Sequence, residues 1–75
     1  MNRLMKFFTY AHLPKPLMDA STPCCDLAFE MDTALPESAE KTAGLRKLLE
    51  AKDCFVRARL EELENEKSKD QDGPA

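Results

Sequence analysis

The chain has 75 residues, of which 43% are hydrophobic, with two Gly, no Trp and a formal net charge of −3. A chain this short buries only about 60 to 65% of its unfolded surface, so its core is marginal for a monomer and self-association is expected. The basic residues are interrupted by acidic ones, which argues against binding of DNA or RNA polymers. No apolar run approaches the length of about 18 residues that a membrane span needs, so no membrane partner is expected.

Residues 1–13 are predicted to form a short N-terminal segment, MNRLMKFFTYAHL. This stretch carries positive charge but lacks a continuous apolar run and a small-residue cleavage site, so it is a poor match to a signal peptide. Three cysteines, Cys24, Cys25 and Cys54, in a chain without an export signal fit a reducing cytoplasm. Their spacing relative to His12 matches no usual zinc pattern, so neither a metal nor a cofactor is expected.

Residues 14–67 are predicted to form a helical hairpin domain, and its first helix covers about 15–34. Pro14 and Pro16 suit a first helical turn, whereas Pro23 predicts a kink or a later start. At helical spacing, one apolar face forms from Leu17, Ala20, Cys24, Leu27, Ala28, Met31 and Leu35. A second strip of Met18, Cys25 and Phe29 lies about 100° away, which indicates two packing partners.

The second helix of the hairpin is predicted over about 39–67. Pro36 disfavours helix before it, and Ser38 can cap its amino end. Residues 68–75, SKDQDGPA, are polar and are predicted to be a disordered tail. The predicted fold class is therefore all-α, an antiparallel helical hairpin with a short N-terminal segment that assembles into a homo-oligomer.

The apolar stripe of this second helix contains two cations, Lys52 and Arg59. A buried charge without a partner is costly, so each should meet a carboxylate, reach solvent along its stem or contact an anionic ligand. Residues 19–40 carry acidic side chains and no basic one, while residues 41–60 are mainly basic. We therefore expect Lys52 and Arg59 to pair with acids of the first helix, in the same or a neighbouring chain.

Catalytic chemistry finds little support in the sequence. The chain has a single His, no paired carboxylates within an enclosed loop and no Cys/His arrangement with an orienting third group. A binding protein is expected rather than an enzyme.

Three segments resemble a known family: FTYAHLP, DLAFEM and ALPESAEKTAGLRKLLEAKDCFVRA. Together they look like the small hairpin-domain family of bacteriophage proteins that defeat the anti-phage CBASS and Thoeris systems, over Phe8 to about Leu60. The resemblance implies a non-enzymatic sponge in the host cytoplasm that sequesters cyclic dinucleotides or cyclic trinucleotides without cleaving them. It also implies a homo-oligomer, mostly a hexamer in this family, with ligand pockets between protomers.

The resemblance implies a first pocket for cyclic dinucleotides that uses an aromatic and a basic group. Tyr10 matches the aromatic by its place in FTYAHLP, where it would stack on a base. Some members have a phosphate-binding lysine in the first helix, where this chain has no base. Candidate replacements for that lysine are Arg3, Lys6, His12 and Lys15, with His12 and Lys15 grouped with Tyr10 as site residues. The alternative role of Tyr10 is packing over the hairpin.

A second implied pocket, for cyclic trinucleotides, lies near the start of the second helix at a threefold axis. Thr42, Gly44 and Arg46 match that place. Thr42 offers a hydroxyl, Gly44 allows close approach and Arg46 offers a fork for phosphate. The alternative is a solvated Arg46 near Glu50.

A function of another class is also compatible with the sequence. The strip of Met18, Cys25 and Phe29, if exposed, would suit a small helical adaptor that binds a host or phage protein.

Overall fold

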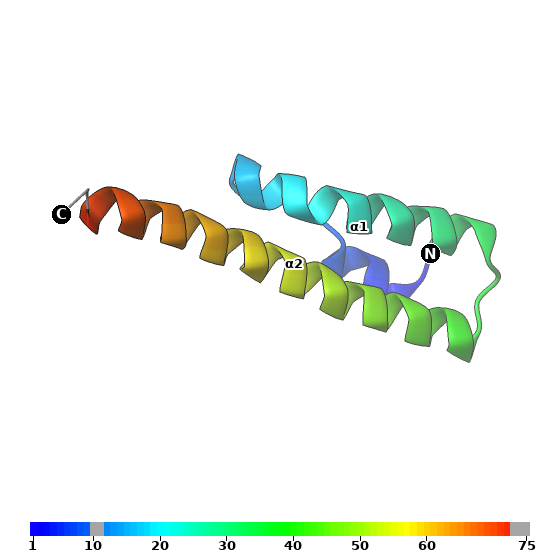
Figure 1. The fold of residues 1–75 in the computed structure, drawn as a ribbon. Coiled ribbons are helices and arrows are strands. Elements are labelled where there is room, and N and C mark those ends of the chain that lie inside the picture. The colour runs from blue at the N-terminus through cyan, green and yellow to red at the C-terminus, as the bar shows by residue number, and fades with distance from the viewer. Residues whose placement is uncertain (10–11, 73–75) are drawn as a thin grey trace.

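The computed structural model describes residues 1–9 and 12–72, with side chains described as far as residue 66. It contains a short 3-10 helix, η1 (Arg3–Phe7), and two α-helices, α1 (Lys15–Ala34) and α2 (Ala39–Asp72). The two long helices run antiparallel as a hairpin, and η1 packs between them on one side (Figure 1). No strand occurs in the described residues, so the all-helical class is confirmed.

Helix α1 starts at Lys15 directly after Pro14, whose backbone is extended, and Pro16 lies in its first turn. Pro23 lies inside the helix, so the later start that it suggested does not occur. The hydroxyls of Ser21 and Thr22 both donate to the carbonyl oxygen of Met18, at 3.1 and 2.7 Å. These bonds add side-chain hydrogen bonding in the turn that precedes Pro23.

Helix α2 is capped as predicted, because the Ser38 hydroxyl accepts the backbone amide of Lys41 at 3.0 Å. Helix α2 ends later than the predicted residue 67, since it continues to Asp72. Residues 73–75 of the predicted tail lie outside the described residues. Polarity alone does not end a helix, and residues 68–72 contain neither Gly nor Pro. In Figure 1 the carboxyl-terminal part of α2 extends beyond the start of α1, so it has no hairpin partner there.

The core draws on all three elements. Its buried hydrophobic cluster consists of Met5, Phe8, Cys25, Ala28 and Leu45. Ala28 is fully buried, and its small side chain allows α1 and α2 to approach closely. Cys25 belongs to the second apolar strip of α1, and its partners in this cluster include Met5 and Phe8. The second packing partner of α1 is therefore the N-terminal segment.

Lys41 closes the turn end of the hairpin. Its ammonium lies 3.0 Å from Asp32 Oδ1 and 2.6 Å from Glu37 Oε1. It also donates to the carbonyl oxygens of Asp32 and Leu35, both at 2.8 Å. These two carbonyls lie at the carboxyl end of α1, so Lys41 neutralises that end of the helix. The hydrogen bond from Lys41 lowers the pKa of Asp32, and the bond to Glu37 raises the pKa of Lys41.

Asn2 attaches the N-terminal segment to the same end of the hairpin. Its backbone amide donates to Asp32 Oδ1 at 3.0 Å, and its side-chain amide donates to Glu37 and Thr42 at 3.2 and 3.0 Å. Its own side-chain oxygen accepts the Leu4 amide and caps η1. Asn2 is 3% exposed, so these bonds replace the water that it would otherwise bind.

The expected pairing of Lys52 and Arg59 with acids of the first helix is wrong within the chain. Lys52 Nζ donates to the Phe7 carbonyl oxygen at 2.6 Å. Arg59 contacts the Pro16 carbonyl oxygen at 3.4 Å and pairs with Glu62 of its own helix at 3.1 Å. Both cations therefore meet backbone carbonyls of other elements where carboxylates were expected.

The acids of α1 account for this difference. Asp26 and Glu30 are exposed. Asp32 is directed to the turn end, where it pairs with Lys41. Residues on the solvent side of α1 cannot reach cations on the packing stripe of α2, whatever their opposite charge.

Candidate functional site

A cleft of about 230 Å³ lies between the residues that follow η1 and the middle of α2. We call it the cation cleft, because three of its seven lining residues carry basic groups. The lining residues are Thr9, His12, Leu13, Lys52, Asp53, Val56 and Arg57. The N-terminal segment and α2 each contribute one wall, so the cleft exists only once η1 has docked on the hairpin.

The three basic groups of the cation cleft differ in exposure and in the hydrogen bonds that they already make. Lys52 is 8% exposed, bonded to the Phe7 carbonyl, and its ammonium lies 5.8 Å from the centre of the Phe8 ring. Arg57 and His12 are exposed. A buried fixed positive charge beneath two exposed N–H donors is an arrangement that attracts an anion.

The other polar contacts of the cation cleft set its charge balance. Asp53 lies 3.8 Å from the Lys52 ammonium and offsets part of its charge. Arg57 donates one N–H to Cys54 Sγ at 3.3 Å. A guanidinium has five N–H groups in a planar fork, so this bond uses only one of them. Arg57 therefore retains donors for a bidentate contact with phosphate.

The predicted dinucleotide residues separate in the structure. His12 lines the cation cleft, whereas Lys15 is exposed and pairs with Asp19 at 2.7 Å. Tyr10 lies outside the described residues. The sequence leaves an anionic ligand open as one partner for Lys52 but does not single out Arg57, and no local pattern links either residue to His12. Only the docking of the N-terminal segment on α2 brings the three groups together.

The predicted trinucleotide residues do not share one pocket on a single chain. Thr42 accepts the hydrogen bond from Asn2, while Gly44 lines a separate apolar groove between α1 and α2. Positions two apart on a helix point about 200° apart, so these two residues face opposite sides of α2. Arg46 is exposed, and no ion pair joins it to Glu50 in the part of the chain that the structure describes.

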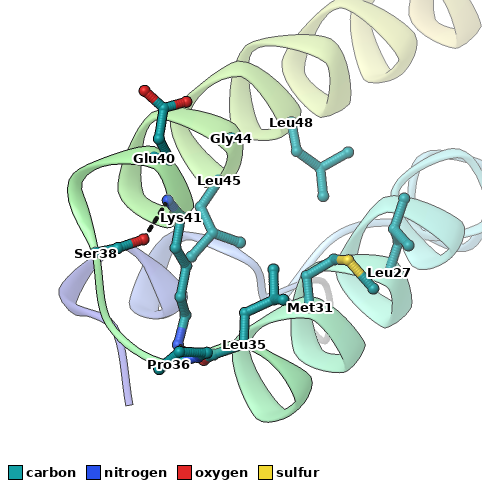
Figure 2. A pocket seen from close by; sticks show the side chains of 10 residues that line it. All are labelled: Leu27, Met31, Leu35, Pro36, Ser38, Glu40, Lys41, Gly44, Leu45 and Leu48. Atoms are coloured by element: carbon teal, nitrogen blue, oxygen red, sulfur yellow. Dashed lines mark hydrogen bonds between the residues drawn. The ribbon is translucent and has the colours of Figure 1, made fainter.

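The second cavity is an apolar groove of about 470 Å³ where α1 and α2 approach the turn (Figure 2). We call it the turn groove. Its lining residues are Leu27, Met31, Leu35, Pro36, Ser38, Glu40, Lys41, Gly44, Leu45 and Leu48. Because Gly44 and Thr42 face opposite sides of α2, the turn groove and the N-terminal segment lie on opposite faces of the hairpin.

The strip proposed for an adaptor surface is not a continuous exposed surface. Cys25 is 5% exposed within the core, whereas Phe29 is 58% exposed. The N-terminal segment packs against Cys25, and Phe29 stays exposed.

Other kinds of site are not seen in the described ranges. No group of three or more His, Cys, Asp or Glu side chains within residues 1–9 and 12–66 is arranged to hold a metal ion. Neither α1 nor the described part of α2 has the length and apolarity that crossing a membrane requires. Comparisons with protein-family models, curated proteins and solved structures return no match to this chain.

Proposed function

We propose that this chain is a phage immune-evasion sponge that binds cyclic oligonucleotide second messengers of host anti-phage signalling in the cation cleft and sequesters them uncleaved. The observation that supports this is the position of His12, from the FTYAHLP segment, beside Lys52 and Arg57 of α2. The resemblance to the CBASS and Thoeris antagonists leaves open which group replaces the phosphate-binding lysine of the first helix, with Arg3, Lys6, His12 and Lys15 as candidates. In this proposal Arg57 takes that role from the second helix.

The chemistry of the cation cleft matches a cyclic nucleotide in two respects. A phosphodiester carries a full negative charge, which the fork of Arg57 and the fixed charge of Lys52 stabilise. A base needs an aromatic face, and such stacking contributes about 1 to 3 kcal/mol. Tyr10 supplies that face in our proposal, because it lies two positions before His12 in the sequence.

A second site for cyclic trinucleotides, made by Thr42, Gly44 and Arg46, requires more than one chain. On one chain Gly44 faces the side of α2 opposite Thr42 and Arg46, so a pocket shared by all three would form only where neighbouring protomers meet. We propose a homo-oligomer, a hexamer by resemblance, for this purpose. Exposed hydrophobic residues support self-association, since Leu27, Leu35, Phe55 and Leu60 are each 43 to 54% exposed.

Isothermal titration calorimetry with cyclic dinucleotides, cyclic trinucleotides and cyclic ADP-ribose isomers tests the proposal. The wild-type chain should bind at least one ligand at micromolar concentration. Arg57→Ala and His12→Ala should weaken binding, because each removes an exposed donor from the cleft. Arg3→Ala is the matched control, since Arg3 is an exposed arginine that does not line the cleft.

The panel also separates the two proposed sites. Arg57→Ala should weaken the binding of cyclic dinucleotides, and Arg46→Ala should weaken the binding of cyclic trinucleotides. Absence of binding across the whole panel would overturn the proposed function. Equal loss of every ligand in Arg3→Ala, Arg46→Ala and Arg57→Ala would mean that only the overall positive charge matters, and would overturn the assignment of the sites.

A further inference from the structure

One face of α2 carries alternating small and large residues at heptad spacing. The small positions are Gly44, Ala51 and Ala58, and the large ones are Leu48 and Phe55, so successive steps are four and three residues. This is the spacing of a seam between two helices. Leu48 also packs against the core cluster, and Gly44 and Leu48 share the turn groove with Leu27 and Met31 of α1. The seam therefore borders α1 at its amino-terminal end, whereas Phe55 and Ala58 further along it are exposed.

Phe55 stands out on this seam because it is 54% exposed. Leu48 lies two helical turns before it, at about 10.5 Å along the axis, and lines the turn groove. An exposed aromatic ring and an apolar groove therefore occur on the same face of one helix.

The walls of the turn groove suit an apolar side chain better than a charged ligand. Its only cation, Lys41, already contacts four oxygens with its ammonium, and Ser38 accepts the amide that starts α2. No free cation remains in its lining to hold an anionic headgroup. A cavity of about 150 Å³ holds a benzene molecule, so about 470 Å³ accommodates a phenyl ring.

We propose that a second copy of this chain docks antiparallel along α2, so that Phe55 of each copy occupies the turn groove of the other. A twofold axis that lies between the two α2 helices, perpendicular to them and level with the midpoint of Leu48 and Ala51, places Phe55 opposite Gly44 and Leu48 opposite Ala51. Every large residue then faces a small one, which is the condition for interdigitated packing. The contact is isologous, so both grooves are filled at once.

Gly44 is what allows the ring to approach. A Cβ atom built at Gly44 meets no atom within 4 Å, so the space above the glycine is open in the isolated chain. A phenyl ring can therefore reach the α2 backbone without displacing any side chain of the groove.

Charge supports the same orientation. Lys47 and Glu50 are exposed and lie on the same flank of the seam. In the antiparallel register, Lys47 of each copy lies about two residues, or about 3 Å along the axis, from Glu50 of the other. The twofold axis creates this attraction twice, and a parallel pairing of α2 helices would not.

The dimer does not rest on the proposed nucleotide function. The cation cleft lies on the face of the hairpin that holds the N-terminal segment, and the turn groove lies on the opposite face. Loss of the dimer and loss of ligand binding are therefore separate outcomes.

Sedimentation equilibrium of the full chain tests the proposal, with circular dichroism to verify folding. The wild type should sediment as a dimer or a multiple of it. Phe55→Ala should raise the dissociation constant about tenfold or more, since a buried aromatic anchor carries a large share of the binding free energy. Phe29→Ala is the matched control, because Phe29 is equally exposed, at 58%, on α1 and away from the groove.

Two further variants keep the test independent of folding defects. Gly44→Leu should fill the groove and abolish the dimer while keeping or raising helix stability, since leucine favours helix over glycine. Lys47→Glu should weaken the dimer, and the double variant Lys47→Glu/Glu50→Lys should restore it. A wild-type monomer at millimolar concentration, equal effects of Phe29→Ala and Phe55→Ala, an undisturbed dimer in Gly44→Leu, or no rescue by the charge swap would each overturn the proposal.

Discussion

The ammonium of Lys52, in the middle of α2, donates a 2.6 Å hydrogen bond to the backbone carbonyl of Phe7, the last residue of η1. The same ammonium lies 5.8 Å from the centre of the Phe8 ring. One buried cation therefore fixes the N-terminal segment against the hairpin and forms the floor of the cation cleft. A carbonyl at the end of a short helix is a suitable acceptor, because it lacks an intrahelical donor.

Replacing Lys52 by Met should lower the free energy of unfolding by about 1.5 to 3 kcal/mol, because a charged hydrogen bond is lost while side-chain volume is kept. Urea denaturation followed by circular dichroism measures this. Lys15→Met is the control, since Lys15 forms an exposed pair with Asp19 that should contribute less than about 0.5 kcal/mol. Equal losses in the two variants would contradict the role given to Lys52.

Leu45→Ala should destabilise the chain by about 2 to 5 kcal/mol, because Leu45 is 2% exposed and truncation leaves a cavity in the core. Leu60→Ala makes the same chemical change at a residue that is 43% exposed, so it should cost far less. Thermal and urea unfolding of the two variants compare them directly. A similar loss in both would mean that Leu60 is buried in solution, as in an oligomer.

Stability should fall in acid partly through Asp32. Its folded pKa lies below the unfolded value because Lys41 and the Asn2 amide donate to its carboxylate. The unfolded chain then binds more protons, so the stabilisation is fully present above the unfolded pKa, about 3.9, and is lost as pH falls through the folded pKa.

Asp32→Asn should therefore be less stable than the wild type at neutral pH, with the difference shrinking as the pH falls below about 4. Urea titrations across an acidic pH series measure this convergence. Asp26→Asn, at an exposed acid of the same helix, should follow the wild type throughout. A difference between Asp32→Asn and wild type that does not change with pH would contradict the proposed linkage.

Of the three thiols, Cys54 should react first with an aromatic disulfide reagent. Cys54 is exposed, whereas Cys24 and Cys25 are buried, and burial raises the pKa of Cys25. The thiolate is the reactive form, so one thiol per chain should react fast in the native protein, and the other two should react only on unfolding. Fast reaction in Cys54→Ser would show that the core opens readily.

Helix positions were largely predictable because helical periodicity and capping are local properties. Ser38 caps α2 three residues before Lys41, and this contact depends only on neighbouring residues. The end of α2 was predicted too early because its last turns are polar and yet contain no helix breaker before Gly73.

The candidate site was less predictable, because it joins residues far apart in the chain. The sequence drew attention to Lys52 but not to the Phe7 carbonyl, since backbone acceptors leave no mark in the residue pattern. His12 and Arg57 are 45 positions apart in the numbering and meet only through the fold. Residues 19–40 are acidic and residues 41–60 are mainly basic. Of the basic residues in 41–60, however, only Lys41 pairs with acidic side chains of 19–40.

The sequence by itself determined the all-helical class, the turn near Pro36 and the need to satisfy cations on the α2 stripe, since these follow from local propensity and the cost of burying charge. The tertiary structure alone decided which groups satisfy them. Docking of η1 covers one face of the hairpin and creates the cation cleft, while the opposite face keeps the turn groove open. That asymmetry depends on contacts between distant residues, such as Lys52 with Phe7, which periodicity cannot encode.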